Sequence, residues 1–460
     1  MTPLPPLLRR LRSRLAPGGL LLDPAECVAY GGDKWFASRT PDAVALPRST
    51  AEVSQVLRFA HRHRIPVTPR GAGHGYVGGC VPVQGGIVLS LERMNRILEV
   101  NRADFVAVVQ PGVVTADLQH RVEKRGLYYP PDPASRGDCS LGGNIVTNAG
   151  GPRCLKYGVT RDYVLGLEIV TPQGEVVRLG SRTHKNKTGF DLHRLYVGSE
   201  GMLGIVTEAT LKLIPLPPYR ACLVAGFARM STATRALAEI FKAGFLPCAL
   251  EIVDAFTLAA ARKRTGSAQF DGCRALVITE LDGQKASVEG EIAALQRVLE
   301  PLHPLTLRTG MGGEECEKVW AIRRQFSYAL RDTGLTKLNE DVVVPRGALG
   351  KLFRLAASIQ RKYGLIVASF GHAGDGNIHV NLMVDLKKPG TRRQADAALD
   401  ELFKGILALG GVVTGEHGVG LAKKPWWKLA VTPEVDALHR TVKRALDPQG
   451  ILNPGKFLGG

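Results

Sequence analysis

The chain has 460 residues, 45% of them hydrophobic, and a formal net charge of +18 at pH 7. This length predicts two or three folded domains. The positive charge is spread along the chain without a basic stripe interleaved with aromatic residues, so a nucleic-acid partner is not expected. An anionic substrate, an acidic lipid surface or an acidic electron-transfer partner suits the sign of the charge better.

The cysteine pattern and the hydropathy indicate where in the cell the protein is expected. Eight cysteines occur singly, with no Cys-x-x-Cys pair, so neither a disulfide framework nor a thiolate zinc site is predicted, and a reducing, cytoplasmic location is favoured. No apolar run approaches the ~20 residues of a membrane-spanning helix. Residues 1–19 place leucines (Leu4, Leu7, Leu8, Leu11, Leu15) on one helical face with arginines between them. We expect a helix docked on its own domain, with a membrane-surface helix at the inner membrane face or a targeting peptide as the alternatives.

The first predicted elements surround a glycine-rich stretch. Ser49 and Glu52 form a capping-box pattern before a helix, and a strand follows. The stretch VTPRGAGHGYVGG, residues 67–79, then resembles a dinucleotide fingerprint, but its glycines and Pro82 cannot sustain the helix that such a site requires. A nicotinamide site is therefore not expected, and what remains is a loop between strands whose backbone N–H groups could form a nest for phosphate oxygens.

The next elements divide the chain into two halves. A helix is predicted over residues 115–126, and short β-rich runs continue to about residue 214, where LIPLPPYR forms a linker. Beyond it strands and helices alternate. Strands over residues 365–370 and 377–384 are joined by a glycine-rich turn, and a helix covers residues 391–409, which predicts an antiparallel sheet covered on one face.

A second glycine-rich stretch, CSLGGNIVTNAGGPRCLKYGVTRD, occupies residues 139–162. Its four glycines allow backbone to approach something flat or charged, or they form a loop of tight turns. Taken alone, this stretch leaves both interpretations open.

Three blocks together carry a family resemblance. PRGAGHGYVGG, PPDPASRGDCSLGGNIVTNAGG and GFDLHRLYVGSEGMLGIVTEATLKL resemble the FAD domain of the p-cresol methylhydroxylase and vanillyl-alcohol oxidase superfamily. Within it the chain is most similar to FAD-linked D-2-hydroxyacid dehydrogenases, the branch of D-lactate dehydrogenase, D-2-hydroxyglutarate dehydrogenase and the glycolate oxidase flavin subunit. GHAGDGNIHVNL, GEHGVGL and LNPGK near the C-terminus match as well.

The resemblance implies an α+β fold in three parts. Residues 1–216 would form a two-part FAD-binding domain of the p-cresol methylhydroxylase (PCMH) type. Residues 217–415 would form a ferredoxin-like substrate or cap domain, with an antiparallel sheet covered by helices. Residues 416–460 would return to the FAD domain.

The resemblance also implies the cofactor contacts. The loops Arg70–Gly79 and Leu141–Gly151 would clasp the FAD pyrophosphate, and Gly198–Val206 would lie along the adenosine and flavin. The residues implied are Pro69, Arg70, Gly71, Ala72, Gly73, His74, Gly75, Gly78, Pro111, Pro131, Asp132, Ser135, Gly142, Gly143, Asn144, Asn148, Gly150, Tyr157, Glu200, Gly201, Gly204, Ile205, Val206 and Asn453.

His74 departs from the pattern of this branch, which carries a small or hydroxyl residue there. In more distant members with a similar loop, the matching histidine bonds covalently to the flavin, so His74 is a candidate attachment point. The alternative is a histidine packed beside the isoalloxazine or donating to a phosphate. Cys139, near a second covalent link of some relatives, is interpreted as a packing residue.

Two histidines and a glutamate make a candidate metal site. His372 and His379 bracket the turn of the predicted hairpin, and Glu416 follows a predicted strand V-V-T. Such a set leaves positions open for substrate on zinc, manganese or iron. By spacing alone the two histidines are equally a buried polar pair, but the resemblance implies a divalent metal on these three residues.

The resemblance implies the remaining roles. His417 matches the general base that takes the hydroxyl proton while hydride leaves C2 for flavin N5. Asn381, two residues beyond His379 on the same strand face, would hold a substrate oxygen. Arg323 and Lys337 would bind the substrate carboxylate, with Ser327 beside them.

The predicted function is therefore FAD-dependent oxidation of a D-2-hydroxy acid, such as D-lactate, D-2-hydroxyglutarate or glycolate, to the 2-oxo acid. Electrons would pass to a quinone, a cytochrome or an electron-transfer flavoprotein, and a homodimer is a further expectation. One alternative is a sugar or aldonolactone oxidase with covalent FAD. The other is a non-catalytic FAD-binding subunit of a larger oxidase.

Overall fold

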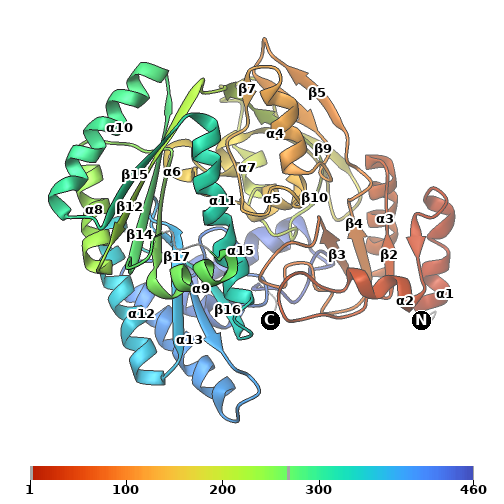
Figure 1. Ribbon diagram of the computed structural model, residues 1–460. Helices are drawn as coiled ribbons and strands as arrows, with labels where there is room; N and C mark the ends of the chain where they lie inside the picture. Colours follow the sequence, from red (N-terminus) through yellow and green to blue (C-terminus); the bar gives the residue numbers. More distant parts are fainter. Residues whose placement is uncertain (1–3, 267–269, 459–460) are drawn as a thin grey trace. The chain divides into compact units, whose positions relative to one another are not determined.

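The chain divides into two compact units in a computed structural model that describes residues 4–266 and 270–458 (Figure 1). The first unit contains the described residues up to Ala149, Val159–Leu216, and the described residues from Glu416 onward. The second contains Gly150–Gly158 and Pro217–Gly415. Sequence reasoning left Gly150–Gly158 in the FAD-binding part, whereas these residues pack with the second unit.

The N-terminal segment docks on the first unit. It forms α1 (Leu4–Arg9) and a 3-10 turn, Arg12–Arg14, and Leu7, Leu8, Leu11 and Leu15 are buried in the same core as the first sheet. The side chain of Leu4 lies outside the described part. The docked-helix interpretation is confirmed for these leucines, because their apolar face is already covered by protein.

A four-stranded sheet forms the first layer of this unit. Ser49 caps α3 (Thr50–His63) by accepting from the Glu52 N–H, while the Glu52 carboxylate accepts from the N–H groups of Arg48 and Ala16. The strand order is β1-β2-β4-β3, with β1 antiparallel and the others parallel. The strands are β1 (Leu20–Leu21), β2 (Ala43–Ala45), β3 (Val67–Arg70) and β4 (Ile87–Ser90).

A five-stranded antiparallel sheet forms the second layer, in the order β5-β6-β10-β8-β9. Its strands are β5 (Ile97–Asn101), β6 (Val106–Val109), β8 (Val164–Val170), β9 (Val176–Gly180) and β10 (Ile205–Lys212). The short strands β7 (Leu127–Tyr128) and β11 (Ile214–Pro215) pair separately. The other helices of the unit are α2 (Pro24–Cys27), α4 (Thr115–Glu123), α5 (Leu141–Thr147), α7 (Leu192–Tyr196), α14 (Trp427–Ala430) and α15 (Pro433–Leu446).

A seven-stranded antiparallel sheet is the centre of the second unit, in the order β15-β12-β14-β13-β17-β18-β16 (Figure 1). Its strands are β12 (Tyr219–Phe227), β13 (Ala249–Asp254), β14 (Ala275–Gly283), β15 (Thr306–Met311), β16 (Thr336–Val343), β17 (Ile366–His372) and β18 (Asn377–Val384). Its helices are α6 (Cys154–Tyr157), α8 (Met230–Lys242), α9 (Ala255–Thr265), α10 (Lys285–Leu299), α11 (Gly312–Arg331), α12 (Leu349–Tyr363) and α13 (Thr391–Ala408).

Helices cover both faces of this sheet, which corrects the expectation of one covered face. Every residue of β18 is buried, as are the first seven of β14. Because successive side chains of a strand point to opposite faces, both faces must be covered. Helices α9 and α11 pack on the face that carries Val224 and Phe370, so α8 and α10, which also contact β12 and β14, cover the other.

All eight cysteines are free thiols. No helix in the described residues is long and apolar enough to cross a membrane.

The C-terminal segment completes the first unit. The buried Glu200 carboxylate accepts from the N–H groups of Val419 (2.7 Å) and Gly420 (2.9 Å). Asn453 donates to the carbonyls of Gly79 and Glu200, and Leu452 bridges β3 at Val67.

Candidate functional site

The first glycine-rich loop offers backbone donors. In the described part of the chain, the N–H groups of Ala72, Gly73, His74 and Gly75 have no protein hydrogen-bond partner. Gly73 has φ +70°, and a Cβ there would collide with the Arg70 guanidinium. Four consecutive unpaired N–H groups in a turn with a left-handed residue form the kind of nest that binds phosphate oxygens.

The two glycine-rich stretches meet at Gly71. A Cβ on Gly71 would lie 2.5 Å from the Ser140 Oγ and 3.4 Å from the Gly143 Cα. The second stretch is not a loop at this point: Ser140 caps α5, which contains both Gly142 and Gly143. The Gly142 N–H donates to the Pro111 carbonyl at 2.7 Å, so this donor is used inside the protein. Unpaired backbone donors are thus found in the first stretch, while the second supplies close backbone packing.

We expect Gly71→Ala to weaken FAD binding, because the added methyl group would lie 2.5 Å from the Ser140 Oγ and so disturb the cap of α5. Overpacking of this kind costs ~1–3 kcal/mol. Gly79→Ala is the matched control in the same loop, since its Cβ would lie 4.0 Å from the nearest atom. Titration of each apoprotein with FAD, followed by flavin fluorescence, measures the difference. Equal affinities would contradict the close packing of the two stretches.

Several other residues expected to contact FAD have their polar groups paired within the first unit. Asn144 donates to Thr115, the Asn148 Oδ1 accepts from the Arg161 N–H, and Glu200 and Asn453 hold the C-terminal segment. Pro69 packs on Gly201, and Gly204 on Tyr196. Asp132 is buried, and the neighbouring Pro131 carbonyl accepts from Gln119. The Ser135 carbonyl accepts hydrogen bonds from two N–H groups of its own turn. Gly78 lies against Trp35, and Ile205 and Val206 are the first residues of β10. Their contacts with FAD stay predictions.

Two of the expected cofactor residues, Gly150 and Tyr157, belong to the second unit. The Tyr157 hydroxyl donates to Asp282 at 2.7 Å. The Tyr157 hydroxyl is therefore paired within the second unit. The spacing of the sequence did not indicate this pairing.

His74 is partly exposed on the first loop. Partial burial and the cationic Lys34 and Arg70 lower the pKa of its imidazole. The ring is therefore held in its neutral form near neutral pH, which is compatible with both interpretations of this residue.

His372 and His379 come together on the β17–β18 hairpin, as its turn predicted. In the antiparallel register His379 lies opposite Phe370, two residues before His372, so both rings are on one face of the sheet. Their ring centroids are 5.5 Å apart, and both side chains are buried.

A buried glutamate that sequence reasoning missed holds this pair. Glu251 on β13 accepts from the His372 Nδ1 at 2.5 Å, and its other oxygen accepts from the Arg323 Nε at 2.5 Å. Burial alone would raise the Glu251 pKa, but the adjacent Arg323 and His372 lower it to about 2. Because Glu251 holds His372 through Nδ1, a metal bound by this ring would use Nε2.

A second buried carboxylate, Asp341 on β16, lies beside the other histidine. Its Oδ1 is 3.9 Å from the His379 Nδ1 and accepts from Asn377 at 2.6 Å. Its Oδ2 accepts from Thr414 (3.1 Å) and from the Gly415 N–H (2.8 Å). Asp341 thus anchors the residue that immediately precedes Glu416 in the chain. The expected strand V-V-T before Glu416 is a single bridge between Val412 and Val343, which corrects that prediction.

The expected substrate-binding residues are found on three neighbouring elements of the second unit. Lys337 on β16 donates to Ser327 on α11 at 2.8 Å, so the lysine and the hydroxyl predicted beside it are in contact. Burial lowers the Lys337 pKa to about 8. Asn381 is buried on β18, where its amide nitrogen donates to the carbonyls of Ala368 and His379. Its Oδ1 is unpaired, so it can accept from a hydroxyl group but has no spare donor.

His417 belongs to the first unit. Its ring centroid lies 5.2 Å from that of Tyr76, and its Nε2 is 3.6 Å from the Glu416 carboxylate. Two aromatic neighbours on different segments, the first loop and the C-terminal segment, thereby pack together.

The sequence contained a signal for the residues that were missed. Glu251 interrupts the apolar strand ALEIVD, and Asp341 precedes the apolar run VVV. An acid at a buried strand position needs a partner inside the protein, so it marks a polar site.

Residues 216–457, over half of the chain, match the family model described as FAD linked oxidases, C-terminal domain. The chain therefore belongs to the FAD-linked oxidase family. Residues 41–180 of this FAD-linked oxidase match the model described as FAD binding domain. It is an FAD-dependent oxidoreductase.

Curated relatives cover nearly the whole FAD-linked oxidase chain. Glycolate oxidase subunit GlcD of Bacillus subtilis strain 168 is 40% identical over 91% of this chain and 89% of that protein. D-lactate dehydrogenase of Anaerostipes hadrus is 34% identical over 92% and 90%. D-2-hydroxyglutarate dehydrogenase of Xanthomonas citri pv. viticola is 36% identical over 95% and 94%.

Solved structures confirm the predicted fold class. Substrate-bound p-cresol methylhydroxylase matches this FAD-linked oxidase with a TM-score of 0.83 at 19% identity, over 99% of this chain and 96% of that one. Alkyldihydroxyacetonephosphate synthase matches with a TM-score of 0.75 at 21% identity, over 98% and 85%. At these identities the likeness describes the fold alone.

Proposed function

We propose that this FAD-linked oxidase oxidises a D-2-hydroxy acid to the 2-oxo acid and passes the electrons to an acceptor other than a nicotinamide. The observation that carries the proposal is the histidine pair of the β17–β18 hairpin, backed by a glutamate that also binds Arg323. The names of the relatives, which refer to glycolate, D-lactate and D-2-hydroxyglutarate, support the substrate class.

A divalent metal fits the residues of this pair. His372 and His379 would supply imidazole nitrogens, each with a buried carboxylate near its Nδ1, and Glu416 would supply a carboxylate oxygen. Outer carboxylates of this kind fix the ring orientation of metal-binding histidines. A bound metal would lower the pKa of the substrate hydroxyl and orient it.

The protein's own residues divide the remaining work. His417 would accept the hydroxyl proton, and Arg323 and Lys337 would bind the substrate carboxylate. The free Oδ1 of Asn381 would accept a hydrogen bond from a substrate hydroxyl. FAD held by the first loop would supply the acceptor of the hydride that leaves C2.

The anaerobic absorbance of the purified flavoprotein tests the proposal. D-lactate, D-2-hydroxyglutarate, glycolate and the L-isomers are added separately, before and after treatment with EDTA. We expect one of these acids, and not an L-isomer, to bleach the flavin band, and we expect EDTA to abolish the bleaching until metal is restored.

Two alternatives make different predictions in that experiment. Bleaching by polyols or aldonolactones that resists EDTA would favour a sugar-type oxidase, and flavin that stays with acid-precipitated protein would then assign His74 as its attachment point. Turnover by the isolated chain would exclude a non-catalytic subunit. The physiological acceptor (quinone, cytochrome or electron-transfer flavoprotein), a homodimeric state and a cytoplasmic location, peripheral to the membrane or not, stay predictions.

The pKa of Lys337 gives a pH prediction. Because burial lowers this pKa to about 8, the ammonium is present below pH 8 and is lost above it. We therefore expect kcat/KM for the anionic substrate, which reports the free enzyme, to fall above about pH 8. Lys337→Arg keeps its charge at all accessible pH values and should remove this decline, while Lys337→Met should be low throughout. An unchanged alkaline limb in both variants would contradict the assignment.

A further inference from the structure

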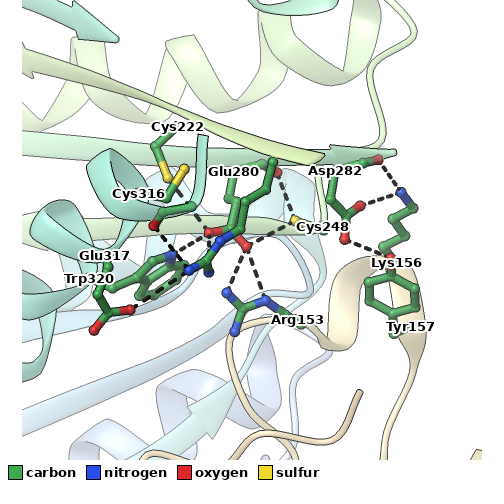
Figure 2. A network of polar contacts seen from close by, with 12 residues as sticks. Arg153, Lys156, Tyr157, Cys222, Cys248, Glu280, Asp282, Cys316, Glu317 and Trp320 are labelled. Atoms are coloured by element: carbon green, nitrogen blue, oxygen red, sulfur yellow. Dashed lines mark hydrogen bonds and ion pairs between the residues drawn. The ribbon is translucent and has the colours of Figure 1, made fainter. Parts of the chain in front are cut away.

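The residues Gly150–Gly158, here called the strap, cross into the second unit in the middle of a stretch expected to bind FAD. The strap follows Ala149 at the end of the α5 segment, and the chain re-enters the first unit at Val159. Four consecutive strap residues form α6. Figure 2 shows that side chains of the strap point at two acids of β14, Glu280 and Asp282.

The contact with Glu280 is buried and charged. Arg153 donates to one carboxylate oxygen, Oε1, through both Nε (3.0 Å) and Nη2 (2.7 Å). Trp320 on α11 donates to the other oxygen, Oε2, at 2.5 Å, and the Arg153 guanidinium lies 5.2 Å from the Trp320 ring centroid (Figure 2). The Glu280 side chain is 1% exposed, so this ion pair is protected from solvent.

The second anchor uses Asp282, two residues along the same face of β14. It accepts from the Lys156 Nζ at 2.5 Å and from the Tyr157 hydroxyl at 2.7 Å. The strap also touches the histidine hairpin, because a Cβ on Gly374, in the turn between His372 and His379, would lie 2.6 Å from the Leu155 Cδ2.

We propose that the strap is a positioning element: Glu280 and Asp282 fix its conformation, and the strap in turn fixes the C-terminal end of α5, the short helix whose N-terminal end packs against the FAD-binding loop at Gly71. The proposal is independent of the substrate class and rests on FAD binding by the first loop. Chain continuity provides the link, since only Asn148 and Ala149 separate α5 from the strap.

A metal ion is a poorer explanation of the same cluster. Cys222, Cys316 and Glu280 offer ligand atoms within 4.8 Å of one another. Arg153 and Trp320 already occupy the two Glu280 oxygens, and a nitrogen of Arg220 lies 3.5 Å from one of them. Two guanidinium groups beside one carboxylate repel a further cation. Glu280 is therefore better explained as the ion-pair partner of Arg153 than as a metal ligand.

The test compares, in the full-length holoprotein, the loss of the Arg153 contact with Glu280 and the loss of the Trp320 contact with the same carboxylate. Arg153→Gln removes the strap's ion pair, whereas Trp320→Phe removes a hydrogen bond to the same carboxylate from a helix outside the strap. Asp282→Asn tests the second anchor and remains informative if Arg153→Gln does not fold. The readouts are the Kd of FAD, measured by flavin fluorescence without substrate, and the amide hydrogen exchange of residues 141–158.

We expect Arg153→Gln to raise the Kd of FAD by ~10-fold or more and to speed exchange in both the strap and α5. Asp282→Asn should have a smaller effect in the same direction, and Trp320→Phe should leave the Kd within ~2-fold, because the Arg153 contacts persist. Faster exchange confined to the strap, with an unchanged Kd in both strap variants, would overturn the proposal. So would a Kd that rises equally in Trp320→Phe, since the effect would then belong to the stability of the whole unit.

Discussion

Replacing His417 by glutamine should lower kcat for oxidation of the D-hydroxy acid by ~10²–10⁴-fold while FAD remains bound. Glutamine keeps a polar side chain of similar length but cannot take the hydroxyl proton. The ring of His417 packs beside Tyr76 of the first glycine-rich loop, which is expected to bind FAD, so the comparison must separate lost chemistry from lost cofactor. Steady-state rates normalised to bound flavin make that separation.

The pH profile and a matched histidine control sharpen this test. The acid limb of the wild-type profile, which reports protonation of the base, should disappear in His417→Gln. His120→Gln changes an exposed histidine on α4 of the same unit and should behave as wild type. Full activity of His417→Gln per bound flavin would remove His417 from the mechanism.

Replacing Glu251 by glutamine should lower both the stability of the second unit and its affinity for metal. The substitution leaves the buried Arg323 without its counter-charge and releases the Nδ1 of His372. Breaking a buried pair costs ~3–5 kcal/mol, and loss of an outer carboxylate costs ~10–100-fold in metal affinity. Urea unfolding and titration of the chelated protein with Zn²⁺ or Mn²⁺ measure the two effects.

The pH dependence of the Glu251 contribution follows from its pKa. The folded-state pKa is lowered to about 2, below the ~4.3 of an exposed glutamate. The contribution to stability is therefore complete above pH ~4.3 and is lost as the pH falls towards 2, so the difference in stability between wild type and Glu251→Gln should shrink as the pH falls below ~4.3. Glu300→Gln, an exposed site in the same unit, is the control. An equally stable, equally metal-binding Glu251→Gln protein would show that Glu251 positions neither partner.

Local patterns made part of the fold and of the site predictable. Two apolar strands around a glycine turn predict the β17–β18 hairpin, and the turn alone brings His372 and His379 close. The α5 segment was harder, because Gly142 and Gly143 argue against a helix. Its stability comes from the local Ser140 cap and from backbone packing against Pro111, and the second of these is a tertiary contact.

Long-range pairings set the limit of sequence reasoning. Glu251 and His372 are separated by 121 positions, and Arg153 and Glu280 by 127. The sequence around each of these residues does not identify its partner, since the pairing depends on the order of the strands in the sheet. The same limit explains why the packing of the strap on β14 was not predicted: its partners Glu280 and Asp282 lie far along the sequence.

The interleaved course of the chain has a consequence for biosynthesis. The first unit needs Val419 and Gly420 to donate to the Glu200 carboxylate and Asn453 to donate to the Gly79 carbonyl, yet Pro217–Gly415 are synthesised before them. At ~5–20 residues per second, the ribosome delays these contacts by ~10–40 s after Leu216 has been made. The nascent FAD-binding half therefore stays incomplete until the segment that carries Leu452, which bridges β3 at Val67, has been synthesised. A message truncated before Val419 would yield a protein whose buried Glu200 carboxylate lacks its donors.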